Sequence, residues 1–176
     1  MPEVSGVAKE GSMSQTADRG HNREGKYLTF GLGSEEYGLE ILKVKEIIGV
    51  MNITSVPQTP RYVKGVINLR GKVIPVIDLR LKFGMDAVEY NDRTCIIVVD
   101  IAGKVGKKTV MGIVVDSVSE VLNIKGEEIE DTPTFGVSLE TDYILGMAKV
   151  KGGVKILLDI NKVLTTDVAV AETMVH

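Results

Sequence analysis

The residues of this chain that are able to support catalysis or bind a metal are few and widely spaced. Its two histidines, His21 and His176, lie near opposite ends of the 176 residues, and the single cysteine, Cys95, sits within an apolar run. A zinc site needs several Cys, His or acidic ligands at close spacing, so we predict no metal site. A lone cysteine cannot form an intramolecular disulfide, and its apolar neighbours favour a packing role for it.

Asp78 and Asp159 are the best candidates for a pair of carboxylates that perform acid–base chemistry. Each follows an apolar, strand-like run and precedes a short helical pattern, which is the position of a helix N-cap. The two residues also occupy equivalent places in an internal repeat, so we expect them in separate structural units. No histidine lies in the predicted ordered core to complete a Ser-His-Asp or Cys-His site. We therefore predict that the chain is not an enzyme and has no catalytic residues.

The loop Gly103–Thr109, GKVGKKT, has some of the letters of a phosphate-binding loop. It lacks the required spacing of glycines, and Lys108 stands where Ser or Thr should follow Lys107. A strand-like run follows the loop, whereas a phosphate-binding loop opens a helix. We predict a basic hairpin loop and no bound nucleotide, and the sequence indicates no other cofactor.

Composition excludes several classes of function. The net charge is −3, from 21 Lys and Arg against 24 Asp and Glu, and only 5% of residues are aromatic. Nucleic-acid binders usually have a basic excess and aromatic stacking platforms, so a nucleic-acid-binding function is disfavoured. No apolar run approaches the roughly 18 residues that a membrane span needs. We expect a cytoplasmic protein with no direct membrane insertion and no nucleic-acid partner.

Two halves of the chain repeat one β-rich pattern. Gly65–Phe83 and Gly146–Leu164 each read as strand, tight turn, strand and short helix, with Gly65, Gly71 and Asp78 matched 81 residues later. Each half offers about five short β segments, which leave exposed edges unless the sheet curls into a barrel. The predicted fold class is all-β with short helices, built from two five-stranded β-barrels that are packed together with a groove between them.

The repeat also sets the predicted boundaries. We expect a disordered tail over residues 1–25, a first barrel over 26–88, a second barrel over 89–165 and a fraying C-terminal tail over 166–176. Within the barrels, Ile41–Val50 is predicted to form a short helix because Ile41, Val44, Ile47 and Ile48 make one helical stripe. Asp116–Leu122 is predicted as another short helix, with Asp116 as its N-cap.

One corner of the first half is not explained by the repeat. Arg70 lies where the first strand of the first hairpin meets the tight turn, with Asn68 beside it on the same face, whereas the second hairpin has Lys149 and Lys151 at these places. Arg70 alone is open to two interpretations, a binding residue or a solvated turn cation. Glu46 is likewise either a binding residue or a solvated helix residue.

The sequence resembles the CheW family of bacterial chemotaxis coupling proteins. The resemblance extends from about Tyr27 to Leu164 and is carried by EEYGLEILKVKEI, TPRYVKGVINLRGKVIPVIDLRLKFG, MGIVVDSVSEVL and TDYILGMAKV. It implies two SH3-like barrels with a hydrophobic interface. It also implies a non-catalytic adaptor that couples the cytoplasmic tip of transmembrane chemoreceptors to the regulatory domain of a CheA-type histidine kinase, in arrays at the inner face of the membrane.

The resemblance also assigns expected site residues. Asn68, Leu69, Arg70 and Gly71 match the N-L-R-G motif of the family, which is tied to receptor binding together with the positions of Val44 and Glu46. Val44 stays divided between core and contact. Gly112 and Val118 match positions tied to coupling between partners. The alternative function is the coupling domain of a phosphorylation-regulated adaptor or of the kinase itself, which has a domain of the same fold.

Overall fold

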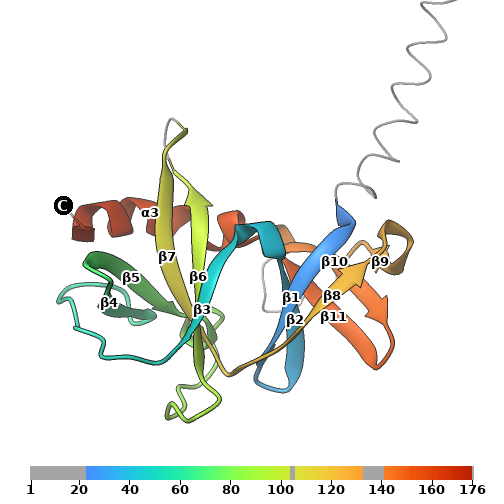
Figure 1. Cartoon of the computed structure of the whole chain (residues 1–176), viewed down its shortest axis with the longest axis horizontal. Coiled ribbons are helices and arrows are strands. Elements are labelled where there is room, and N and C mark those ends of the chain that lie inside the picture. The colour runs from blue at the N-terminus through green and yellow to red at the C-terminus, as the bar shows by residue number, and fades with distance from the viewer. Residues whose placement is uncertain (1–22, 104–105, 133–140, 176) are drawn as a thin grey trace, which may run out of the picture.

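The fold consists of two β-sheets, with a C-terminal helix packed against one of them (Figure 1). A computed structural model describes residues 23–103, 106–132 and 141–175, so most of the predicted N-terminal tail lies outside the described residues. Sheet A has the order β8 (Ser117–Ile124), β1 (Gly25–Leu32), β2 (Glu35–Glu40), β11 (Gly153–Leu158), β10 (Ile144–Val150) and β9 (Ile129–Glu130). Sheet B has the order β3 (Val44–Gly49), β6 (Cys95–Ala102), β7 (Lys108–Val115), β5 (Lys72–Asp78) and β4 (Val63–Leu69).

Sheet B closes on itself through the segment that follows β3. Thr54 forms an isolated bridge with Val66 on β4, with both N···O distances at 2.8 Å. This bridge connects the chain leaving one outer strand, β3, to the other outer strand, β4. Gly65 permits the approach, because a Cβ at this residue would lie 1.9 Å from the Thr54 carbonyl oxygen. The five strands therefore form a small barrel, which we call barrel B, and sheet A forms the body that we call barrel A.

Three hydrophobic cores account for the apolar runs of the sequence. On β6, Ile96 and Val98 point into barrel B, whereas Ile97 and Val99 point into the larger core between the two barrels. Strand β5 is divided in the same way, with Val76 inside barrel B and Ile77 between the barrels. A strand that is covered on both faces has no polar face, which explains why these runs lack alternation. The third core lies within sheet A.

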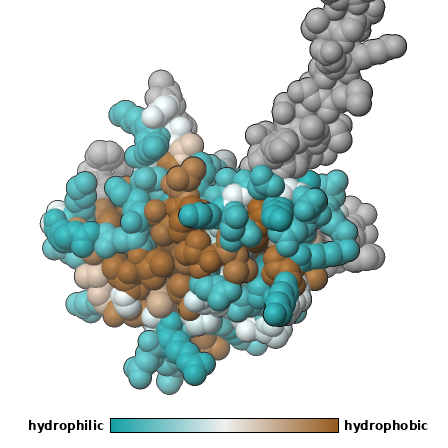
Figure 2. All heavy atoms as spheres, turned by 45° about the vertical axis from the view of Figure 1, so that its right-hand side comes forward, coloured by the Kyte–Doolittle hydropathy of each residue, from teal (hydrophilic) through white to brown (hydrophobic). Residues whose placement is uncertain are grey.

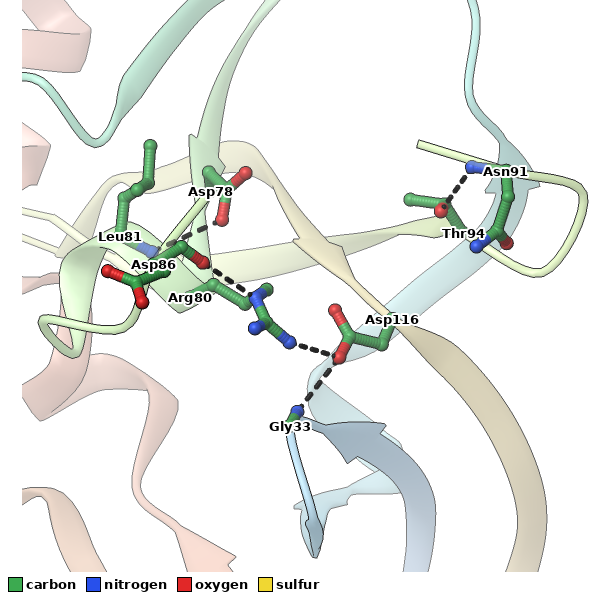
Figure 3. Close-up of polar contacts among 8 residues, drawn as sticks. All are labelled: Gly33, Asp78, Arg80, Leu81, Asp86, Asn91, Thr94 and Asp116. Atoms are coloured by element: carbon green, nitrogen blue, oxygen red, sulfur yellow. Dashed lines mark hydrogen bonds and ion pairs between the residues drawn. The ribbon is translucent and has the colours of Figure 1, made fainter. Parts of the chain in front are cut away.

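A polar clamp reinforces the junction of the two barrels (Figure 3). Arg80, from the short helix α2 (Leu79–Lys82), forms an ion pair with Asp116 at 2.6 Å between Nη1 and Oδ2. The same carboxylate oxygen accepts a hydrogen bond from the backbone N–H of Gly33, in the β1–β2 turn, at 2.8 Å. Asp116 lies between β7 and β8, where the chain passes from one sheet to the other. The carboxylate thus joins three segments from both barrels.

The C-terminal segment is a helix, so the predicted tail over 166–176 is wrong. Helix α3 (Ile160–Val175) follows β11 of sheet A but packs against β5, β6 and β7 of sheet B. Val163, Leu164 and Val168 enter the core between the barrels. Asp167 is buried, accepting from Tyr62 Oη at 2.6 Å and pairing with Lys82 Nζ at 2.8 Å. Tertiary contacts therefore stabilise a segment that is rich in Val and Thr and has weak intrinsic helix propensity.

Two segments that were predicted as helices are strands in the structure. Ile41–Val50 contains a short 3₁₀ turn, η1 (Ile41–Lys43), and then β3, while the predicted helix Asp116–Leu122 is the residue before β8 and the first part of that strand. Asp116 does not cap a helix, because a strand follows it, and its carboxylate instead binds Arg80 in the inter-barrel clamp. In β3 the side chains alternate between half-buried and exposed, as in a strand with one covered face.

The barrels also do not follow the predicted division at residues 88 and 89. Strands β1 and β2, from the first half, pair with β8 and β11 of the second half, and β6 and β7 of the second half belong to sheet B. The predicted tail is too long as well, because Arg23 pairs with Asp131 at 2.9 Å and Glu24 accepts from the Gly126 N–H. By contrast, the predicted hairpins around Gly33, Gly71 and Gly152 are confirmed.

Candidate functional site

The turn between β4 and β5 has an unusual backbone for its sequence. Arg70 and Gly71 are its two central residues, with φ of 53° and 86°. Positive φ at both positions is the mark of a type I′ hairpin turn, which suits glycine but strains arginine. The Asn68 side chain stabilises the turn, because its Oδ1 accepts a hydrogen bond from the Gly71 N–H at 2.8 Å. Asn68 and Gly71 therefore shape the turn that presents Arg70.

Arg70 forms an ion pair with Glu46 on β3. The Arg70 side chain is 71% exposed and the Glu46 side chain 30%. The pair connects the tip of the β4–β5 hairpin to the opposite outer strand of sheet B. The family resemblance assigned both residues to one candidate site although they are 24 positions apart, and the structure brings them into contact.

The ion pair lies at the rim of a hollow in barrel B with a volume of about 140 Å³. The floor of the hollow is apolar and consists of Leu69, Ile74, Val98 and Val110. Its rim is charged and contains Lys45, Glu46, Arg70 and Lys72. Three cations against one carboxylate make the rim electropositive, which suits a partner with carboxylates.

The chain is similar to known proteins over most of its length. The family profile described as "CheW-like domain" matches residues 26–168. The chain is 44% identical to a "Chemotaxis protein CheW" of Klebsiella aerogenes, over 81% of this chain and 82% of the relative. It is 32% identical to a "Chemotaxis protein CheW" of Rhizobium meliloti, over 88% of this chain and 97% of the relative. The chain belongs to the CheW-like family.

A solved structure of the family has the same fold. The "scaffolding protein TtCheW from Thermoanaerobacter tengcongensis" matches with a TM-score of 0.70 and 36% identity, over 80% of this chain and 92% of that one. The predicted fold class, two SH3-like barrels packed together, is thereby confirmed. As a member of the CheW-like family, the chain is a non-catalytic adaptor of chemotaxis. Among the described residues, no helix is long and apolar enough to cross a membrane.

The remaining residues expected from the CheW-like family lie away from the rim of the hollow. Val44 is half-buried against the core between the barrels, as is Val118 on β8. Gly112 is buried on β7, where a Cβ would lie 2.8 Å from Ile96 Cγ2 inside barrel B. Gly112 thus permits tight packing and presents no side chain to a partner. Its assignment, like those of the other site residues, stays a prediction.

Sequence reasoning missed Lys45 and Lys72 as members of the site. Lys45 was missed because Ile41–Val50 was expected to be a helix. A helix at this place gives no reason to expect Lys45 beside Arg70. Lys72 follows directly after the N-L-R-G motif and was assigned to the turn alone. The register of the hairpin could have identified Lys72. It pairs with Leu69 and therefore starts the second strand directly beside the turn.

The residues first considered for chemistry have structural roles in this CheW-like fold. Asp78 Oδ1 accepts from the Leu81 N–H at 3.2 Å, and its Oδ2 accepts from Tyr90 Oη at 2.8 Å. Burial, followed by the hydrogen bond to Asp78, raises the pKa of Tyr90. Asp159 accepts from the Lys162 N–H at the start of α3. The described residues contain no group of three or more Cys, His, Asp or Glu side chains able to hold a metal.

Proposed function

We propose that this chain couples the cytoplasmic tip of chemoreceptors to a CheA-type histidine kinase, with the Arg70 corner as its receptor-facing site. The observation that carries this proposal is the presentation of Arg70. Its guanidinium is largely exposed, its backbone is held in a conformation that disfavours arginine, and Glu46 fixes its direction. Strained residues that the surroundings hold in place are concentrated at functional sites.

Apolar surface near the outer strands supports a docking role. Ile47 on β3 is 41% exposed and Val121 on β8 is 49% exposed, and these are outer strands of the two sheets. Figure 2 shows a broad hydrophobic area across the middle of one face, bordered by hydrophilic side chains. Interfaces of this type combine an apolar centre with a polar rim. Receptor helices would bury the apolar groups, and Arg70 and Glu46 would set their register.

The kinase partner follows from the shared fold. The family resemblance implies that the regulatory domain of a CheA-type kinase has the same pair of barrels, and the contact would then join one barrel of each protein. The adaptor would be cytoplasmic and recruited to receptor arrays at the inner face of the membrane. It transmits a signal only if its affinity for the kinase differs between receptor states.

Co-sedimentation with receptor-containing membranes and the kinase tests the proposal. We expect Arg70→Glu to weaken receptor binding about tenfold or more, because it reverses the charge that the site presents. The matched control is Lys151→Glu, which reverses a cation at the equivalent turn of the second hairpin. Circular dichroism verifies folding of both variants. Unchanged receptor affinity in a folded Arg70→Glu protein would contradict the proposal.

A further inference from the structure

The hollow in barrel B has the size and chemistry of a pocket for one side chain. Its volume is about 140 Å³, and its floor is formed by Leu69, Ile74, Val98 and Val110. A protein cavity of roughly 150 Å³ with such a lining accommodates a benzene molecule. A Leu, Ile or Phe side chain therefore fits, whereas a whole helix does not. Ile74 and Val98 belong to the interior core of barrel B, so a bound side chain would extend that core.

The rim selects for a negatively charged neighbour of that side chain. Glu46 is already neutralised by Arg70. Within the part of the chain that the structure describes, Lys45 and Lys72 have no ion-pair partner, and both are exposed. A carboxylate that is next to the inserted apolar group would find these two cations at the edge of the hollow. Such complementarity contributes to orientation and selectivity.

We propose that the hollow binds one large apolar side chain of an acidic partner segment, with Lys45 and Lys72 pairing with the partner's carboxylates. The existence of the pocket does not depend on the proposed function. The identity of its natural occupant does rest on that function, and the occupant is then the receptor tip. It adds the type of residue that the partner must contribute, namely a Leu, Ile or Phe flanked by Asp or Glu. The Arg70–Glu46 pair spans the rim and so lies against the inserted group.

A small probe tests the hollow without any receptor. Phenylacetate combines a benzene ring with a carboxylate, benzyl alcohol is its neutral counterpart and benzylamine its cationic one. We expect phenylacetate to bind with millimolar affinity and to shift the methyl NMR signals of Leu69, Ile74, Val98 and Val110. Benzyl alcohol should bind more weakly, and benzylamine most weakly. No shift of these four methyl groups, or tightest binding of benzylamine, would overturn the inference.

Two variants separate the floor from the rim. Val110→Phe fills the hollow and should abolish the phenylacetate shifts. Lys72→Glu lies at the exposed rim and should weaken phenylacetate roughly three- to fivefold, as expected for a solvent-exposed charge pair. Lys151→Glu is the control for charge and should leave binding unchanged. Should Val110→Phe fail to fold, the Lys72→Glu result decides on its own, and equal weakening by Lys72→Glu and Lys151→Glu would contradict a local rim effect.

The occupant is tested separately with a cytoplasmic-tip fragment of a chemoreceptor. Val110→Phe should weaken its binding at least tenfold, and the phenylacetate probe should compete with it. If the wild-type chain binds phenylacetate but not the fragment, the hollow is a real site and the proposed function fails. If the fragment binds equally to wild type and to folded Val110→Phe, the proposed function survives and this inference is wrong.

Discussion

Arg70 and Glu46 form an ion pair that spans the two outer strands of sheet B, from the tip of the β4–β5 hairpin to β3. The pair fixes the direction of a guanidinium that is otherwise exposed. It also lies at the rim of the apolar hollow of barrel B. The N-L-R-G corner is therefore a composite of a shaped turn, a paired charge and an apolar floor, and each part can be changed separately.

Exchanging the charges of this pair separates its structural role from its binding role. Arg70→Glu or Glu46→Arg alone should lower the free energy of unfolding by no more than about 1 kcal/mol, because the Arg70 side chain is 71% exposed and solvent weakens the ion pair. The double variant should regain that stability but not receptor affinity, since the cation has moved to the other strand. Urea denaturation and co-sedimentation measure the two effects. Recovery of receptor binding in the double variant would show that only the pairing matters.

The strained backbone of Arg70 leads to a second prediction. Replacing Arg70 by glycine removes about 1 kcal/mol of backbone strain, because glycine adopts the left-handed conformation freely. The replacement also removes a weak ion pair, so Arg70→Gly should change the free energy of unfolding by less than about 0.5 kcal/mol. Among the described non-glycine residues, only Gln58 and Arg70 have positive φ, so Lys151 gains no such relief. Lys151→Gly should therefore destabilise by roughly 0.5–1 kcal/mol. Urea midpoints of the two variants test the difference, and equal losses would contradict it.

Arg70→Gly should nevertheless bind receptor as poorly as Arg70→Glu. If Arg70 had only a structural role in the turn, glycine would fit this position better than arginine. A variant that keeps its stability but loses its partner identifies a residue retained for binding. Retained affinity in the glycine variant would remove Arg70 from the site.

The sequence predicted the internal repeat and the corner because both depend on local signals. The turn residues Gly71 and Gly152 and the caps Asp78 and Asp159 act within a few residues of their own positions. The strand β3 was mistaken for a helix because Glu46 interrupts its alternation. Its carboxylate lies on the half-buried face, where Arg70 compensates it. The residue that broke the local pattern is thus a member of the candidate site.

The exchange of strands between the halves was not predictable from local pattern. The strands β1 and β2 pair with each other, as predicted, but nothing in their alternation specifies that β8 and β11 are their outer partners. The continuation of helix α3 beyond Leu164 was missed for a similar reason, since Asp167 within it is held by Tyr62 and Lys82, which are 105 and 85 positions away. Contacts over such separations are properties of the assembled fold.

The close approach at Gly65 predicts a steep cost for a single methyl group. Gly65→Ala should lower the free energy of unfolding by about 3 kcal/mol or more, because its Cβ would collide with the Thr54 carbonyl and its φ is 139°. Gly25→Ala is the matched control, with φ of 153° but nothing within 4 Å of the added Cβ. Urea denaturation gives the difference. Hydrogen exchange at Thr54 and Val66 should accelerate only in Gly65→Ala, and equal costs at both glycines would exclude the steric cause.

The buried pair of Asp167 and Lys82 fixes α3 to barrel B. Asp167→Ala should cost about 3–5 kcal/mol, because it leaves the buried Lys82 ammonium unpaired. Tyr62→Phe removes one hydrogen bond to the same carboxylate and should cost only about 1 kcal/mol. Lys82→Met combined with Asp167→Leu should recover most of the loss. Thermal unfolding measures all three, and a small loss in Asp167→Ala would contradict the role of the pair.

The same pair predicts how stability responds to alkaline pH. Burial alone would lower the pKa of Lys82, but the hydrogen bond and the charge of Asp167 outweigh it and raise the pKa above 10.5. A raised pKa means that the folded protein holds this proton more tightly than the unfolded chain. The contribution is therefore complete below pH 10.5 and is lost as pH rises through the folded pKa. Lys82→Met combined with Asp167→Leu should flatten the decline of stability above that pH in urea titrations.

Glu36 should act at the opposite end of the pH range. Its carboxylate accepts from Lys155 Nζ at 2.9 Å and from Ser119 Oγ at 2.8 Å, and the hydrogen bond from Lys155 chiefly holds its pKa below 4.5. The folded state then binds this proton less tightly, so the contribution is present above pH 4.5 and is lost as pH falls through the folded pKa. Because the site is partly solvated, we expect less than about 1 kcal/mol. Glu36→Gln should reduce the acid loss of stability in urea titrations. Identical acid profiles for wild type and Glu36→Gln would show that the three side chains contribute no net stability.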